Sequence, residues 1–266
     1  MTDDAASPMN SGMSPVSGDP VCTIRDGDGV PIAHYEHEWR SGRPWAADLS
    51  MDDEVTTVNP RVVSLVATTL AGWGATAIAE VAGPFIANGA QSVRVFHTYT
   101  MNLTDSSATI EPDLRPGLRA VPARNMSAAA LRPALSAAYP PSHPDFDSEA
   151  FAALDGLYDG TLMGPLSPCS TTVVEGHRVV AAALVNDTES DGPWLSEIFR
   201  VPEPQFAGLG TALLQIVIAQ ATAAGLPTLG LSVTDSNPAR TVYERIGFRR
   251  TGTWMDFIFP APGVEP

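Results

Sequence analysis

Two glycines stand just before a long apolar run that carries no charge. Gly208 and Gly210 open the run, and no charged residue occurs between Glu203 and Asp235. Helix starts usually carry an Asp or Glu in the first turn, where it suits the positive end of the helix dipole. When the first turn of a helix has no carboxylate, its backbone N–H groups can bind the anion of a ligand, and glycines let that anion approach closely. The stretch therefore predicts an anion site at the beginning of a helix within residues 203–225.

The spacing of the glycines decides between three kinds of phosphate-binding loop. A P-loop needs a Lys after its last glycine, and this chain contains no Lys. A dinucleotide-binding fingerprint needs a third glycine, at a position that is Leu213 here. The pattern that remains is Gln-x-x-Gly-x-Gly, formed by Gln205, Gly208 and Gly210.

A second segment, NPARTVYERIGF at 237–248, stands at a fixed distance downstream of the glycines. Asn237 predicts the start of a short helix, Tyr243 lies inside it, and Gly247 predicts its end. Upstream of the glycines, a strand is predicted to end with FRV at 199–201. Glu197 lies four residues before the end of that strand and so on the same face as its last residue.

These motifs together resemble the GCN5-related N-acetyltransferase (GNAT) family over residues 115–260. The resemblance implies an α/β fold, a mixed and mostly antiparallel sheet flanked by helices, and acetyl-coenzyme A (acetyl-CoA) as co-substrate. It implies that the loop binds the diphosphate of the coenzyme, through Gln205, Phe206, Ala207, Gly208, Leu209, Gly210 and Thr211. The backbone of Phe199, Arg200 and Val201 is expected to pair with the pantetheine arm. Asn237 either caps its helix or touches the coenzyme, and Arg240 either reaches a phosphate or lies on the surface.

The resemblance also implies a direct attack of an amine on the thioester. Tyr243 is the expected acid, because a phenol stays protonated at neutral pH and can protonate the departing thiolate; the alternative is a core aromatic. Glu197 is the expected base that removes a proton from the substrate ammonium; the alternatives are a solvated strand residue or a charge that positions the substrate. His143, Asp145 and Asp147 are interpreted as solvated loop residues. Cys169 has no His at a recognisable spacing, and no metal site is expected.

The chain is expected to have three parts: a flexible tail over 1–20, an accessory region over 21–110, and the catalytic domain over 111–266. The accessory region resembles a degenerate half of a second GNAT domain. A helix over 59–73 and a strand over 92–103 repeat the order of the C-terminal part, with Phe85 opposite Tyr243 and Gly89 opposite Gly247. No glycine lies near the start of the first helix, so this region is expected to bind no coenzyme. The alternative is an unrelated accessory domain.

Composition narrows the possible partners. The net charge of −15 argues against nucleic acid. Two cysteines cannot form a disulfide framework, and the sequence has neither a signal peptide nor 18 consecutive apolar residues, so we expect a soluble, cytoplasmic protein without a membrane partner. A homodimer is left open. The acceptor is expected to be a small amine metabolite, an antibiotic or a peptide N-terminus. The alternatives are a non-catalytic acyl-CoA sensor, or an acyltransferase that uses a longer acyl chain.

Overall fold

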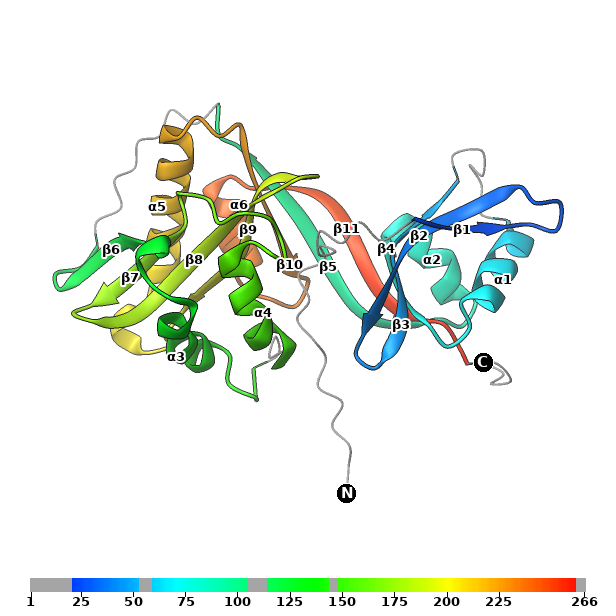
Figure 1. The fold of residues 1–266 in the computed structure, drawn as a ribbon, viewed down its shortest axis with the longest axis horizontal. Helices are drawn as coiled ribbons and strands as arrows, with labels where there is room; N and C mark the ends of the chain where they lie inside the picture. The colour runs from blue at the N-terminus through cyan, green and yellow to red at the C-terminus, as the bar shows by residue number, and fades with distance from the viewer. Residues whose placement is uncertain (1–20, 53–58, 105–113, 144–147, 262–266) are drawn as a thin grey trace, which may run out of the picture. The chain divides into compact units, whose positions relative to one another are not determined.

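The computed structural model describes residues 21–52, 59–104, 114–143 and 148–261. The expected tail over 1–20, and Asp145 and Asp147, lie outside the described residues. The described chain forms two compact units (Figure 1). The catalytic unit holds residues 99–233 and 237–250, and the accessory unit holds 21–98, 234–236 and 251–261. The division therefore does not fall at residue 110, because two long strands each contribute residues to both units.

The catalytic unit is built on β6 (Leu118–Pro122), β7 (Thr171–Glu175), β8 (Arg178–Thr188), β9 (Gly192–Arg200) and β10 (Thr228–Thr234). Neighbours from β6 to β9 pair antiparallel, whereas β9 and β10 are parallel. The helices are α3 (Ala128–Ala138), α4 (Ser148–Asp159), α5 (Leu209–Ala223) and α6 (Arg240–Ile246). Pro133 lies inside α3 without splitting it.

Helices cover both faces of this sheet, as Figure 1 shows. The Thr171 hydroxyl donates to the Gln220 side chain of α5 at 3.0 Å, which places α5 on the face of Thr171 and its partner Ala183. Asn186, three residues along β8, donates to the carbonyl of Leu157 in α4 at 2.8 Å. Residues an odd number apart on a strand point to opposite faces, so α4 covers the face opposite α5.

The helix α5 is a core helix. The longer segment Pro204–Ala223, which contains α5, would suit a membrane span by length and composition alone. Seven residues of α5 are buried, however: Leu209, Leu213, Leu214, Ile216, Val217, Ile218 and Ala221. It packs against β7, β8 and β9. Burial in this sheet accounts for its apolar sequence without a bilayer.

The strands β9 and β10 diverge soon after they meet. Their described pairing is the single register match of Trp194 with Gly230. A β-bulge follows at once in β9, because Val185 pairs with Leu195 and Leu184 pairs with Glu197, so that Ser196 is the extra residue. A bulge bends and twists its strand. Beyond Trp194 the described residues of β9 and β10 have no further register match, and this unpaired stretch is called the opening between the two strands.

The accessory unit contains β1 (Cys22–Arg25), β2 (Pro31–Arg40), β3 (Arg43–Met51) and β4 (Gly74–Ile78). Two helices, α1 (Pro60–Thr69) and α2 (Ala79–Ala87), pack on this unit, with Asn59 capping α1 as expected. The residues of β5 (Gln91–Asn102) and β11 (Arg249–Ile258) are divided between the two units. The eleven described strands follow the order β1-β2-β3-β4-β11-β5-β10-β9-β8-β7-β6.

The expected repeat is confirmed in the details of both units. Strands β3 and β4 pair in parallel where Trp45 meets Gly74, as β9 and β10 do where Trp194 meets Gly230. The ends of α2 and α6 also match. The Phe85 carbonyl accepts from the amide five residues later at 3.0 Å, and the Tyr243 carbonyl does the same at 3.1 Å. Each of these turns has a glycine with positive φ, which a residue with a side chain rarely adopts.

Some elements differ from the sequence prediction. The sequence near the C-terminus favours two strands, FRRTGT and MDFIF, but they are one continuous strand, β11. Gly252, which resembles a turn residue, instead packs against Thr98 and Trp254. The pattern of residues 75–81 favours a strand over that whole range, but the strand ends at Ile78, where α2 begins. The hairpins of β1, β2 and β3 were not predicted.

Candidate functional site

The beginning of α5 is an exposed set of backbone donors. Its N-cap is Gly208, with φ of 82° in the left-handed region, and no side chain caps the helix. The first turn contains no acidic residue. The amides of Leu209, Gly210 and Thr211 precede the first possible helical hydrogen bond, so they have no acceptor within the helix. An added Cβ would meet nothing within 4 Å at either Gly208 or Gly210, so both glycines border open space.

Arg115 binds the loop that leads into α5. No sequence motif marks this residue. Its guanidinium donates to the carbonyl of Gln205 at 2.6 Å and to the carbonyl of Ala207 at 3.2 Å. The carbonyl and the following N–H of a peptide point in opposite directions. A fixed Ala207 carbonyl therefore turns the Gly208 amide away from Arg115. Arg115, Gln205 and Gly208 also line a cavity of about 220 Å³ beside the loop.

The side chain of Gln205 contributes to the loop and not to an open anion site. Its amide donates to Glu203, whose other partner is Arg178. The Arg178 guanidinium also lies 5.9 Å from the centre of the Phe206 ring, which is buried. Arg178 holds the pKa of Glu203 below its usual range and neutralises the acid nearest to the loop.

The free edge of β9 provides fewer backbone groups than the sequence predicted. The Val201 amide donates to the Val180 carbonyl of β8 at 2.8 Å, and the Val201 carbonyl accepts from the Arg200 guanidinium at 3.1 Å. Phe199 lies two residues away and so directs its backbone groups to β8 as well. Among the three expected residues, Arg200 therefore turns its backbone groups toward the opening.

Glu197 lies on β9 at the edge of the opening. Its partly buried carboxyl is 3.4 Å from the hydroxyl of Tyr139, which is the residue that ends α3. Burial raises the pKa of Glu197 to about 7, while the Ile198 amide and the Tyr139 hydroxyl hold the pKa down by a smaller amount. A carboxyl with this pKa exchanges protons readily near neutrality.

Tyr243 lies in α6 and is 8% exposed. Its ring contacts Phe248 edge-on, with 6.0 Å between centroids. The helix is anchored by Tyr99 of β5, whose hydroxyl donates to Glu244 at 2.7 Å. Burial, followed by this hydrogen bond, raises the pKa of Tyr99 to about 12.

The remaining expected residues have local partners. The Asn237 side chain accepts from the Ala239 amide at 2.8 Å in the turn before α6, but it does not cap the helix, whose N-cap is Ala239. Arg240 is the first residue of α6. His143 packs edge-on against Tyr139 at 5.1 Å between centroids. Cys169 is buried, and burial raises the pKa of its thiol, which disfavours the thiolate that covalent chemistry needs. In the part of the chain that the structure describes, no cluster of three or more His, Cys, Asp or Glu could hold a metal.

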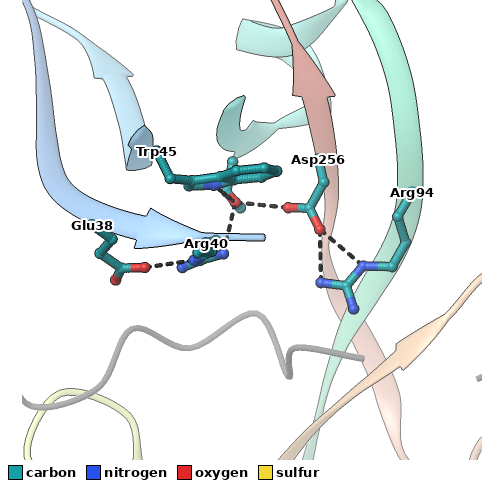
Figure 2. A network of polar contacts seen from close by, with 6 residues as sticks. Glu38, Arg40, Trp45, Arg94 and Asp256 are labelled. Atoms are coloured by element: carbon teal, nitrogen blue, oxygen red, sulfur yellow. Dashed lines mark hydrogen bonds and ion pairs between the residues drawn. The ribbon is translucent and has the colours of Figure 1, made fainter. Parts of the chain in front are cut away.

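The corresponding place in the accessory unit is filled by its own side chains (Figure 2). The Trp45 indole donates to the Thr76 hydroxyl at 2.9 Å, and that hydroxyl donates to Asp256 at 2.7 Å. Asp256 pairs with Arg94 at 2.7 Å, and the Arg40 guanidinium approaches Thr76 at 3.3 Å. Acid and base are thus paired inside this network, which corresponds in place to Trp194 and Gly230. The start of α1 is capped by the side chain of Asn59, unlike the start of α5.

Comparison with known proteins finds a family match for part of the chain. Residues 171–256 match the acetyltransferase (GNAT) domain family, over less than half of the chain. The matched residues include β9, the glycine loop, α5 and α6, which are the elements that form the candidate site.

Relatives and solved structures agree with this assignment. The chain is 33% identical over 90 residues to the [ribosomal protein bS18]-alanine N-acetyltransferase of Haemophilus influenzae, a match that spans 34% of this chain and 60% of that protein. A tandem GNAT protein from the clavulanic acid biosynthesis pathway has the same fold over 93% of this chain and 86% of its own, with a TM-score of 0.65 and 13% identity. A GCN5-related N-acetyltransferase from Sphaerobacter thermophilus matches over 92% and 82%, with a TM-score of 0.64 and 17% identity. Both structural matches extend over nearly the whole chain, so the shared fold includes the accessory unit.

Proposed function

We propose that the protein transfers the acetyl group of acetyl-CoA to a primary amine by direct attack. The observation that carries this proposal is the α5 start, which presents uncapped amides and no carboxylate at one end of the opening between β9 and β10. The open space at Gly208 and Gly210 fits a diphosphate that must approach the backbone closely. The backbone of Arg200 lies along the path from these glycines to Glu197.

Each reacting group has a distinct task. Acetyl-CoA supplies a thioester, which is the activated acyl group. Glu197 accepts the proton of the incoming ammonium, for which its pKa of about 7 is well matched. Tyr243 keeps its proton at neutral pH and donates it to the sulfur as the thiolate departs. Because the amine attacks directly, no protein nucleophile is required, in agreement with the buried thiol of Cys169.

We further propose that the acceptor amine is a peptide N-terminus. The Haemophilus influenzae relative is an N-acetyltransferase that acts on an alanine of ribosomal protein bS18. A screen of small amines and short peptides, read by release of the coenzyme thiol, tests both proposals. Turnover of peptides above other amines is expected. Coenzyme binding without release for any amine would instead support an acyl-CoA sensor.

A further inference from the structure

The indole N–H of Trp194 is a buried donor without an acceptor. Trp194 is 5% exposed, and its Nε1 has no hydrogen-bond partner among the described residues. Buried polar groups in folded proteins are nearly always hydrogen-bonded, so an exception needs a physical explanation. The place of Trp194, at the start of the opening between β9 and β10, connects this donor to the reaction.

The accessory unit provides an internal comparison for this side chain. A Cβ added to Gly74 would lie 2.0 Å from Cε3 of Trp45, and one added to Gly230 would lie 2.3 Å from Cε3 of Trp194. In both pairs Cε3, Cζ3 and Cδ2 are the three nearest atoms, so both rings cross their glycine in the same way. The Trp45 N–H then reaches Thr76, two residues after Gly74 (Figure 2). By this correspondence, the Trp194 N–H points toward the part of β10 at Ser232, two residues after Gly230.

The two units differ in what meets this N–H. In the accessory unit, which lacks the glycine loop, the chain supplies its own acceptor at 2.9 Å. In the catalytic unit the geometry is retained but no acceptor is supplied. A donor that is unmet in the unit with the glycine loop, but met in the unit without it, is explained most simply by an acceptor that arrives with a ligand.

The strand register shows which ligand can reach the donor. Trp194 pairs with Asn186 and Glu197 pairs with Leu184, which lies two residues away on β8. Both side chains therefore lie on one face of the sheet, the face of α3 and α4 and not that of α5. The amine must approach Glu197 from this face to lose its proton. Atoms of the acceptor next to the amine thus come close to Trp194.

We propose that the Trp194 indole N–H donates a hydrogen bond to a carbonyl oxygen of the acceptor, next to the carbon that bears the reacting amine. Trp194 is then a specificity-determining residue that selects amines with the chemistry of a peptide N-terminus. This inference rests on the proposed acetyl transfer to a peptide amine. It adds the contact that distinguishes a peptide from an alkylamine.

Two acceptors and one variant test the contact. The acceptors are a short peptide that begins with alanine, and the same peptide with its first peptide bond replaced by an (E)-alkene, which keeps the shape and removes the oxygen. The ratio of kcat/KM for the two is measured in the wild type and in Trp194→Phe. Any difference in basicity between the two amines affects both proteins equally, and cancels when the two ratios are compared.

We expect the wild type to prefer the peptide by roughly 10- to 100-fold, the range for a buried hydrogen bond that is lost with one partner left unpaired. In Trp194→Phe the two acceptors should be used within about twofold of each other, with the affinity for acetyl-CoA unchanged. Trp45→Phe is the matched control, because it removes the same N–H from the accessory unit and should retain the wild-type preference.

An unchanged preference in Trp194→Phe overturns the inference. So does a loss of acetyl-CoA affinity with the preference retained, since the N–H would then bind the co-substrate. If Trp194→Phe does not fold, Ser232→Thr replaces it. The β-branch of Thr restricts the rotamer of the hydroxyl, as in Thr76, and should hold it as an internal acceptor for the N–H, which reduces the preference; an unchanged preference is again contrary. A wild type that binds acetyl-CoA but acetylates neither peptide refutes the proposed function, and this inference with it.

Discussion

Glu197 shows how one side chain acquires a pKa suited to its task. Burial disfavours the carboxylate and raises the pKa, whereas the Ile198 amide and the Tyr139 hydroxyl favour the carboxylate and limit the rise. The Tyr139 hydroxyl lies 3.3 Å from the Ile198 carbonyl and 3.4 Å from the Glu197 carboxyl. It has one proton to donate, so it can turn toward Glu197 when the carboxyl ionises. The carboxyl of Glu197, the proposed base, can therefore be either neutral or charged near pH 7.

The pH dependence of the reaction follows from this pKa. Below about 7 the Glu197 carboxyl is protonated and cannot accept a proton, so kcat/KM should rise tenfold per pH unit and level off above about 7. Glu197→Gln should lower kcat/KM by roughly 10²- to 10⁴-fold and remove this limb of the profile. Any rise due to ionisation of the acceptor amine should remain in both proteins. An unaltered limb near pH 7 in the variant would assign the base to another group.

The hydroxyl of Tyr243 is expected to act only in the chemical step. Tyr243→Phe keeps the ring and its contact with Phe248, so the fold and coenzyme affinity should be retained. The loss of the acid should lower kcat by roughly 10²- to 10⁴-fold. Steady-state kinetics with calorimetric coenzyme binding measures both quantities. Activity within twofold of the wild type would make Tyr243 a packing residue.

The sequence could predict the residues whose role depends on local pattern. Gly208, Gly210 and Tyr243 belong to motifs with fixed spacing, so the sequence alone could select them as candidates. Arg115 and Tyr139 could not be found this way, because each acts through a partner roughly 60 or more positions away. Trp194 could have been noticed from an internal comparison. A second pair of Trp and Gly, Trp45 with Gly74, has the same contact between ring and glycine as Trp194 with Gly230.

At the scale of elements, the site depends on how α5 begins and on where β9 leaves β10. The bulge at Ser196 and the single match at Trp194 produce the opening, and the Arg115 guanidinium fixes the loop that faces its other end. Because the carbonyls of Gln205 and Ala207 are bound to Arg115, the N–H groups that follow them in the loop are oriented before any ligand arrives. Such preorganisation reduces the cost of binding.

Removal of the Arg115 guanidinium should therefore weaken coenzyme binding more than it slows the chemistry. We expect Arg115→Ala to raise the KM and Kd for acetyl-CoA by roughly 10-fold, the loss of two hydrogen bonds that organise an exposed loop, with kcat nearly retained. Arg115→Lys should be intermediate, because an ammonium cannot bridge both carbonyls. Arg119→Ala on β6 removes a neighbouring exposed charge and should have little effect. If Arg115→Ala and Arg119→Ala raised the Kd for acetyl-CoA equally, Arg115 would contribute only its positive charge and not its two hydrogen bonds.

Element boundaries were predictable where caps and glycines mark them, and less so elsewhere. Asn59 and Ser127 cap α1 and α3, as their sequence positions indicate. The long strand β11 was divided in the prediction, since Gly252 resembles a turn residue but serves close packing. The hairpins from Cys22 to Met51 contain polar and charged residues at alternate positions without a strong apolar pattern, and their pairing depends on contacts that sequence alone does not show.

At the scale of the whole molecule, the two units cannot be separated by one cut in the chain. Residues Tyr99–Asn102 of β5 belong to the catalytic unit, although they lie within the accessory region expected over 21–110. Tyr99 is 1% exposed and anchors α6 through Glu244. The accessory unit in turn takes most of β11, including Asp256 of the network with Arg94.

Deletion of residues 1–110 should consequently damage the catalytic unit itself. The fragment would lose β5, expose the apolar surface that Tyr99 covers, and release α6 with Tyr243. We expect an aggregating or strongly destabilised protein, measured by size-exclusion chromatography and thermal unfolding. A soluble, monomeric 111–266 fragment that melts like the whole chain would show that the accessory part is an independent module.

The most direct test of the account is acetyl transfer by the wild type and by two variants of Gly210. Mass spectrometry follows a peptide that begins with alanine, while thiol release is measured in the same reaction. The peptide should gain one acetyl group on its α-amino nitrogen for each coenzyme thiol released. Gly210→Glu should abolish transfer by placing a carboxylate in the anion site, whereas Gly210→Ala adds only a methyl group to open space and should remain active. Transfer that survives in Gly210→Glu, or coenzyme binding without any acetylated product in the wild type, would contradict it.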